Sequence, residues 1–468
     1  MNQTKMTTQD SGPFDWPLAQ EAEDFLRRHV EAICIRNDFL QSFEEKLRGQ
    51  TGTDLFEWID HVVLPLELEP EVVGAGMARD ESAETAAGEL VYEHPRATLP
   101  RVLLQRESRE SALGVALRPE SVADFIARQN LPVEFEGEPY SRYRRAWVSR
   151  SGGVGVQAVE RRGYRGFVPA ALKPGELKSL VRAQEVIATR PRLFAEDAEG
   201  FRVATGILAR AIDLVGVDSA CHFFFANERA YWQSRNRAGR LQKHRQDLQG
   251  LGWGNHDHHT FRCSRAHFVE LIELLVRLGF EKRERYYAGA EAGWGAQVLE
   301  QPVTGIVVFA DVDLMPDETQ IDFSTTRLAP AARLGTVGLW VGLHGESFLE
   351  AGMHHLEARF DFERLREQLQ QSGVGTMKPF SDFAFLRQAF TEGERWPVRR
   401  ERLERLLRAG YIDRGQFDKF LAEGALGSHL ENLQRRAGFK GFNQKSVSAI
   451  ISATDPRQQH FTTAPVGA

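Results

Sequence analysis

Hydrophobic and polar positions repeat with two different periods along the chain, and the changes of period mark the predicted elements. Residues 17–50 carry apolar side chains at helical spacing and predict helices. Short alternating runs from residue 58 onward predict strands, and residues 175–250 return to the helical period. A second set of strands begins near residue 257. The pattern therefore predicts two strand-rich regions joined by a helical region.

Within these regions a strand–helix–strand–strand unit recurs, starting near residues 58, 111, 257 and 354. The segment RAHFVELIELLVRLGF (265–280) is predicted as a largely buried helix that ends at a glycine. The segment GTVGLWVGLHG (335–345) is predicted as a strand. Short strands with one helix per unit indicate an α+β architecture with mostly antiparallel pairing.

Composition limits what this chain binds and where it works. Its 59 basic and 65 acidic residues give a net charge of −6, so no overall field attracts nucleic acid or an anionic membrane. The only cysteines, Cys34, Cys221 and Cys263, match no zinc or disulfide framework and indicate a reducing compartment. The sequence also shows no apolar signal core and no run of about 18 apolar residues. We therefore expect a cytoplasmic protein without nucleic-acid or membrane partners.

Two histidine doublets stand at corresponding places in successive units. DHHTFR (257–262) and HHLEARF (354–360) both form the first strand of a unit, just before its helix. Equivalent strands of paired units face each other across a shared sheet, so histidines from both can converge on one ion. Two histidines and a carboxylate form the ligand set of non-haem iron(II) sites that keep positions open for substrate. The later alternating segment HLENLQR (429–435) offers Glu431 as the carboxylate.

These motifs resemble those of the vicinal oxygen chelate superfamily, which is built from paired βαβββ modules. In its 4-hydroxyphenylpyruvate dioxygenase family one iron histidine follows an aspartate at a strand start, as His258 follows Asp257. A second histidine opens the next module, as His355 does in GMHHLEARF. The third ligand lies in an FLE-x-x-QR strand, followed by a glycine-rich turn and a closing helix, which HLENLQR and GFKGFNQKSVSAIISA match. The preceding LLQ-x-FT strand is matched by FLRQAFT.

The chain also resembles the 2-oxoadipate dioxygenase/decarboxylase family. That family places an arginine four residues after its first metal histidine, where it binds the substrate carboxylate, and Arg262 stands at this offset. Both families oxidise a 2-oxo acid at iron(II) with loss of CO₂. The resemblance therefore implies an iron(II)-dependent dioxygenase whose small-molecule partners are a 2-oxo acid and O₂. The implied metal ligands are His258, His355 and Glu431, the implied substrate-binding residues are Arg262, Gln388 and Asn443, and Arg262 and Gln388 are also the implied catalytic residues.

Several alternatives remain open at this point. His354 competes with His355 because the doublets blur the register, and Glu357 or Glu300 can replace Glu431 as the third ligand. The same scaffold supports extradiol ring cleavage, isomerase and lyase chemistry, because fold does not fix function. A non-catalytic protein that binds a small ligand in the same cleft is a further hypothesis.

The domain organisation follows from the changes of pattern. We predict a helical segment (1–57), an N-terminal module pair (58–174), a helical connection (175–253) and a C-terminal metal-binding domain (254–468) with a helical insertion near 397–425. His61 in WIDHVVL repeats the Asp-His strand start, but no later carboxylate motif pairs with it. The N-terminal pair is therefore expected to shape a pocket without binding metal. The sequence leaves homo-oligomer formation open.

Overall fold

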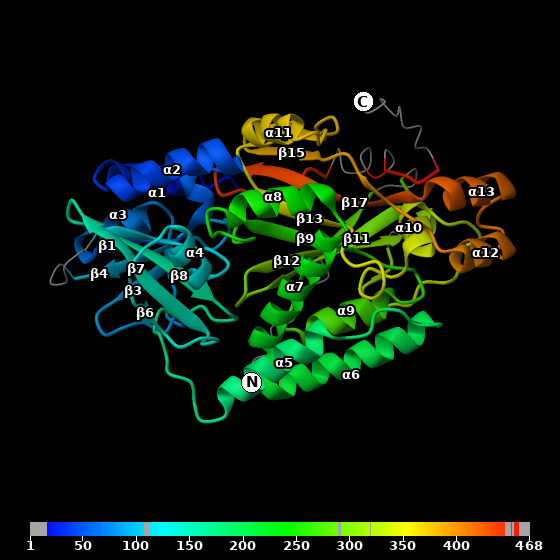
Figure 1. The fold of residues 1–468 in the computed structure, drawn as a ribbon, viewed down its shortest axis with the longest axis horizontal. Coiled ribbons are helices and arrows are strands. Elements are labelled where there is room, and N and C mark those ends of the chain that lie inside the picture. The colour runs from blue at the N-terminus through cyan, green and yellow to red at the C-terminus, as the bar shows by residue number, and fades with distance from the viewer. Residues whose placement is uncertain are drawn as a thin grey trace.

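Two mixed β-sheets, each built from two βαβββ modules, form the framework of the chain (Figure 1). Helices α1 (Gln20–Ile35) and α2 (Asp38–Thr51) precede the first sheet, as the helical period of this segment predicts. The computed structural model describes residues 16–106, 113–288, 292–318, 320–444, 451 and 454–457.

The N-terminal sheet has the strand order β2-β3-β4-β1-β5-β8-β7-β6. Its first module comprises β1 (Ile59–Pro65), α3 (Glu69–Gly74), β2 (Ala78–Arg79), β3 (Leu90–Glu93) and β4 (Arg101–Gln105). Its second module comprises β5 (Gly114–Leu117), α4 (Val122–Arg128), β6 (Phe135–Glu136), β7 (Tyr143–Ser151) and β8 (Val154–Arg161). The first strands of the two modules, β1 and β5, pair antiparallel at the centre of the sheet.

Four helices connect the two sheets and cover one side of the second (Figure 1). They are α5 (Glu176–Ala188), α6 (Asp197–Val215), α7 (Val217–Ser234) and α8 (Arg237–Asp247). Buried side chains such as Phe201 and Phe224 share one apolar core with Phe261 and Phe268 of the second sheet region. In the described parts of the chain, no helix has the length and apolar character needed to cross a membrane.

The C-terminal sheet repeats the same order as β10-β11-β12-β9-β13-β17-β15-β14. Its first module comprises β9 (His256–Arg262), α9 (Phe268–Arg277), β10 (Glu281–Tyr287), β11 (Trp294–Gln301) and β12 (Ile306–Asp313). Its second module comprises β13 (His355–Arg359), α11 (Phe362–Gln371), β14 (Ser381–Phe383), β15 (Leu386–Phe390) and β17 (Ala425–Arg435). The repeated unit and the α+β class predicted from the sequence are therefore confirmed.

Helix α9 shows why the local prediction succeeds. Phe268, Leu271, Ile272 and Leu275 are spaced three or four residues apart and are all buried. The helix ends just before Gly279, whose φ of 84° lies in the left-handed region that glycine adopts without strain. The pattern of residues 265–280 is thus sufficient to define a helix.

The segment 335–345 is a helix, so its prediction as a strand is wrong. Helix α10 (Thr336–His344) is apolar on all sides and largely buried, and a continuous apolar run does not distinguish a strand from a buried helix. The Asp313 carboxylate accepts hydrogen bonds from the backbone amides of Gly335, Val337 and Gly338 at 2.7–3.1 Å. The capping residue lies at the end of a strand, more than 20 residues before the helix, so the sequence of the helix itself does not reveal it.

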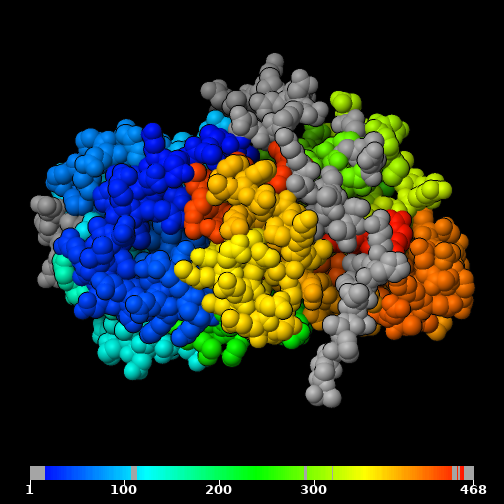
Figure 2. Space-filling view, turned by 90° about the horizontal axis from the view of Figure 1, so that it is seen from above, coloured from blue at the N-terminus to red at the C-terminus, as the bar shows by residue number. Residues whose placement is uncertain are grey.

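A helical insertion separates β15 from β17. It contains β16 (Glu394–Trp396), α12 (Arg400–Arg408) and α13 (Arg414–Glu423). Figure 2 shows these two helices at one end of the molecule and the N-terminal half at the other, with α11 between them. The closing helix expected after Asn443 falls largely on residues outside the described ranges.

Candidate metal centre

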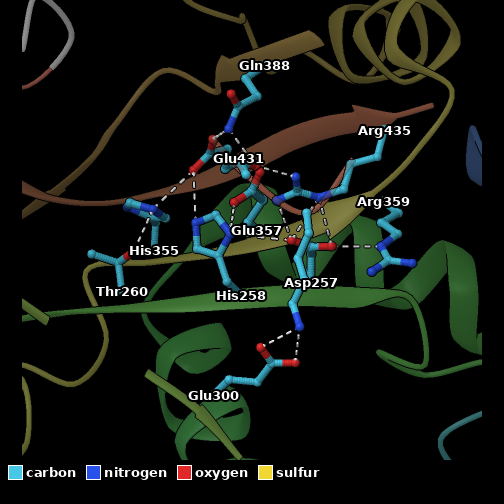
Figure 3. Close-up of polar contacts among 12 residues, drawn as sticks. Asp257, His258, Thr260, Glu300, His355, Glu357, Arg359, Gln388, Glu431 and Arg435 are labelled. Atoms are coloured by element: carbon cyan, nitrogen blue, oxygen red, sulfur yellow. Dashed lines mark hydrogen bonds and ion pairs between the residues drawn. The ribbon is translucent and has the colours of Figure 1, made fainter. Parts of the chain in front are cut away.

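Three side chains from three neighbouring strands converge near the centre of the C-terminal sheet (Figure 3). His258 lies on β9, His355 on β13 and Glu431 on β17. The Nε2 atom of His355 lies 3.1 Å from Oε2 of Glu431, and Nε2 of His258 lies 4.0 Å from the same oxygen. One ligand atom from each residue lies within 4.8 Å of the other two, and all three side chains are buried. This spacing allows one cation to contact all three.

The imidazole of His258 is oriented by carboxylates on its other side. Its Nδ1 contacts Oε2 of Glu357, and Oδ2 of Asp257 lies 3.4 Å away. Burial lowers the pKa of His258, so the ring is neutral, as a metal ligand must be. A carboxylate that accepts the Nδ1 proton fixes the tautomer in which Nε2 is free to bind metal.

Gln388 on β15 holds the two carboxylates of the site. Its amide nitrogen donates to Oε1 of Glu431 at 3.0 Å and to Oε1 of Glu357 at 3.2 Å. The Oε2 atom of Glu431 is thereby left facing the histidines. The Oε1 atom of Gln388 is buried and has no hydrogen-bond partner among the described residues.

The electrostatics of this cluster favour a bound cation. Burial raises the pKa of Glu431 to about 7. Burial and the neighbouring Glu431 also raise the pKa of Glu357 well above its usual value. The raised pKa values show that the cluster has too little positive charge to stabilise two ionised carboxylates. A divalent cation would supply that charge. The donor set therefore fits a metal ion.

His355, rather than its neighbour His354, belongs to the converging group. The Nε2 atom of His355 lies 2.9 Å from the hydroxyl of Thr260, and burial followed by the charge of Arg262 lowers its pKa to about 3. His354 instead packs its ring against Trp340, with centroids 5.3 Å apart. The two rings contact each other through their Nδ1 atoms at 2.9 Å, but only His355 directs a nitrogen toward Glu431, which favours it over His354 as the ligand.

An apolar side chain occupies the position that is symmetric to Glu431. In β12, Val307 pairs with His258, and Phe309 lies two residues further on. In β17, His429 pairs with the other histidine, and Glu431 lies two residues further on. The Phe309 ring packs against His258, with centroids 4.5 Å apart. A metal held by His258, His355 and Glu431 would therefore receive no fourth protein ligand from this position.

Arg262 provides an unpaired positive charge on the same strand. Its guanidinium is buried, and within the described residues none of its three nitrogen atoms has a hydrogen-bond partner. Burial lowers its pKa to about 10, so the group still carries its proton at neutral pH. Its position two residues beyond Thr260 places it on the face of β9 that carries His258. The charges of Asp311, Asp313 and Asp455 partly offset the effect of burial, but none of these carboxylates accepts a hydrogen bond from the guanidinium, which therefore suits the carboxylate of a ligand.

The remaining predicted residues lie further out. Asn443 donates to the carbonyl of Phe380 at 3.2 Å, and Phe380 reaches the site only through Phe390, whose ring contacts His355. Glu300, an alternative third ligand, lies on β11 and pairs with Lys440 at 2.8 Å. Sequence reasoning did not assign the supporting role of Glu357. Its place two residues after His355, on the same strand face, is the available signal.

A second group of possible ligands shares His258 with the first. Asp257, His258 and Glu357 also lie close enough to hold a metal ion. Asp257, however, accepts hydrogen bonds from Arg359 at 2.7 Å and from Arg435 at 2.9 Å. Although burial raises it, the pKa of Asp257 is held well below its usual value by these two arginines. This acid is already neutralised, so the group with His355 and Glu431 is the stronger candidate.

No model of a protein family matches the chain, and no curated protein matches it. Among solved structures, a triple mutant of 4-hydroxymandelate synthase from Streptomyces coelicolor shares 13% identity, with 86% of this chain and 98% of that chain covered and a TM-score of 0.26. Methylmalonyl-CoA epimerase from Mycobacterium tuberculosis shares 14% identity over 39% of this chain and 88% of that chain, with a TM-score of 0.22. Glyoxalase I from Zea mays shares 15% identity over 24% and 44%, with a TM-score of 0.18.

Such low TM-scores carry no weight for the activity, and the strand order decides the fold. Both sheets place the first strands of two βαβββ modules side by side at their centre. The chain has a vicinal oxygen chelate fold. In this chain the two-sheet arrangement places the candidate metal centre on the C-terminal vicinal oxygen chelate unit, on strands β9, β13 and β17.

Proposed function

We propose that the chain is a non-haem iron(II)-dependent dioxygenase that oxidatively decarboxylates a 2-oxo acid and hydroxylates the product. The supporting observation is a two-histidine, one-carboxylate group with Phe309 at the symmetric fourth position and the unpaired Arg262 on the same strand face. Three ligands on one side of a metal leave room for a bidentate substrate and for O₂.

The chemistry that iron(II) supplies when bound is chelation of a 2-oxo acid and activation of O₂. His258, His355 and Glu431 would hold the metal. Glu357 contacts Nδ1 of His258, and Gln388 fixes the orientation of the Glu431 carboxylate. These contacts hold the ligand atoms in position before the metal binds.

Arg262 would position the substrate. Its planar guanidinium can donate two parallel hydrogen bonds to a carboxylate, and none of its nitrogen atoms is hydrogen-bonded to another described residue. The rings of Phe309 and Phe390 pack against His258 and His355 and exclude water from these sides of the site.

The test is O₂ uptake and CO₂ release by iron(II)-loaded protein with a panel of 2-oxo acids. We expect uptake with at least one acid, its loss in Glu431→Ala and its retention in Glu300→Ala. The second variant removes a carboxylate outside the converging group and is the matched control. Protein that binds iron but consumes no O₂ with any acid of the panel would contradict the proposal.

One observation supports a second candidate, an O₂-independent isomerase or lyase. Glu357 lies against His258 and belongs to the other possible ligand group. Were it to bind the same ion as Glu431, four protein ligands would occupy the metal and fewer positions would remain for O₂. Turnover under anaerobic conditions with zinc or nickel would identify this candidate.

A further inference from the structure

The N-terminal sheet repeats the C-terminal sheet strand by strand, so its register identifies the positions that correspond to the metal ligands. Asp60 and His61 start β1 as Asp257 and His258 start β9. His355 pairs with Thr260, which lies two residues after His258. In the N-terminal sheet Gly114 pairs with Val63, which lies two residues after His61. Gly114 therefore takes the place of His355.

The third ligand position is found in the same way. Glu431 pairs with Glu357, which lies two residues after His355. Gln157 pairs with Ala116, which lies two residues after Gly114. The three corresponding positions thus hold a histidine, a glycine and a neutral amide. Only one of them keeps a metal-binding side chain.

The remaining histidine, His61, nevertheless keeps the aspartate and arginine contacts that orient its counterpart His258. Nδ1 of His61 lies 2.7 Å from Oδ2 of Asp60, and the Asp60 carboxylate also accepts hydrogen bonds from Arg161, at 2.8 Å through Oδ1 and at 2.9 Å through Oδ2. Arg161 corresponds to Arg435, the partner of Asp257 in the other half. Burial lowers the pKa of His61, so its ring is neutral and Nε2 is a hydrogen-bond acceptor. The N-terminal half therefore keeps an oriented acceptor without a metal.

A cavity of about 440 Å³ opens on this face of the sheet, within the range of small-molecule sites. Gly114 and Gly155 form part of its lining, and a Cβ atom on Gly114 would lie 2.3 Å from the carbonyl oxygen of Gly155. The close backbone approach excludes side chains here and leaves space for a ligand. The side chains that give the cavity its chemistry are His61, Tyr143, Arg145, Trp147, Gln157 and Phe167.

The walls combine aromatic surface with the two positive charges of Arg145 and Arg150 and the single carboxylate of Glu89. The guanidinium of Arg150 lies 4.0 Å from the Trp147 ring centre, and the ring of Phe167 meets His61 edge-on at 4.9 Å. Arg145 donates from two nitrogens to one oxygen of Glu136 at 2.7 and 2.9 Å. Both partners of this pair are partly exposed, and such a surface pair contributes about 0–1 kcal/mol. Arg145 can therefore exchange Glu136 for a ligand carboxylate at little cost.

We propose that the N-terminal half contains a metal-independent binding site for a planar aromatic carboxylate that carries a hydroxyl group. The aromatic ring packs on Trp147 and Phe167, and the carboxylate binds Arg145. The hydroxyl donates to Nε2 of His61 and accepts from the Gln157 amide, and both side chains line the cavity.

The test is titration calorimetry on the full chain after removal of metal with a chelator, with 4-hydroxybenzoate as the probe. We expect one molecule bound per chain. Phenol lacks the carboxylate and cyclohexanecarboxylate lacks the planar ring and the hydroxyl, so each is expected to bind at least about tenfold more weakly. Equal affinity for phenol would overturn the assigned role of Arg145.

Variants locate the binding site. Gln157→Leu and Arg145→Met are expected to weaken 4-hydroxybenzoate binding at least about tenfold while the melting temperature stays near that of the wild type. His258→Ala, which removes a side chain of the C-terminal site, is expected to leave binding unchanged. Absence of binding to the wild type, or loss of binding in His258→Ala with retention in the other two variants, would refute the proposal.

Discussion

Replacing Arg262 by methionine is expected to stabilise the ligand-free protein, although most buried substitutions destabilise. Methionine fills a similar volume with an apolar chain, while the arginine buries a charge that has no hydrogen-bond partner in the described structure. The same substitution removes the group that we assign to the substrate carboxylate. Stability and ligand binding should therefore change in opposite directions.

The magnitude follows from the pKa of Arg262, which burial lowers from 12.5 to about 10. At about 1.36 kcal/mol per unit, this difference of about 2.5 units corresponds to about 3 kcal/mol of unfavourable free energy for the buried charge at neutral pH. In the ligand-free chain no described group accepts a hydrogen bond from this charge. Replacing the arginine by methionine therefore removes most of this unfavourable free energy. We expect Arg262→Met to increase the free energy of unfolding by about 1–3 kcal/mol.

The assay is urea unfolding of metal-free protein, followed by intrinsic fluorescence, with Arg265→Met as the matched control. Arg265 lies three residues further along and is bound to Glu318 at 2.6 and 2.7 Å. Removing it leaves a carboxylate without its partner and is expected to destabilise by about 3–5 kcal/mol. If both variants lose stability to the same extent, the Arg262 guanidinium is already satisfied and the reasoning fails.

Three further predictions concern the metal centre and its support. Glu357→Ala should lower iron(II) affinity by about 10–100-fold in competition with a chromogenic chelator, because His258 loses its orienting carboxylate; unchanged affinity would contradict this role. Iron(II) affinity should fall about tenfold per pH unit below pH 7 and level off above it, because the proton on Glu431, whose pKa is raised to about 7, competes with the metal; a flat profile from pH 5 to 8 would count against this ligand. Asp60→Asn and Asp257→Asn should each destabilise by about 3–5 kcal/mol in urea unfolding, whereas only Asp257→Asn should lower metal content; equal metal loss in both would show that the N-terminal position also binds metal.

Local patterns of the sequence predict the repeating units because each unit contains its own evidence. The starts expected near residues 58, 111, 257 and 354 correspond to strands that begin at Ile59, Gly114, His256 and His355. Alternation and helical spacing depend on which face of an element is buried, and this is written into neighbouring residues. The α+β class and the paired modules follow from the order of these elements.

Features that depend on contacts between distant segments could not be predicted from local pattern. Helix α10 is capped by Asp313 at the end of β12, and its own apolar sequence was therefore interpreted wrongly as a strand. The choice between His354 and His355 depends on which of them faces β17, a matter of register between strands. Glu357 acquires its role only because β9 and β13 are adjacent. Whether Arg262 has a hydrogen-bond partner depends on residues that are distant in the sequence, so the residues next to it in the chain do not predict it.

The glycine that replaces a histidine on β5 has a consequence for how these two halves can diverge. A side chain at residue 114 would collide with the backbone of β8, so a single substitution there would first have to push β5 and β8 apart. Restoring a second ion site would thus require a shift of the main chain in addition to two exchanged residues, Gly114 and Gln157. A cation site in this half is for that reason not reached by exchanging side chains alone, whereas a ligand that needs no ion requires no shift of these strands.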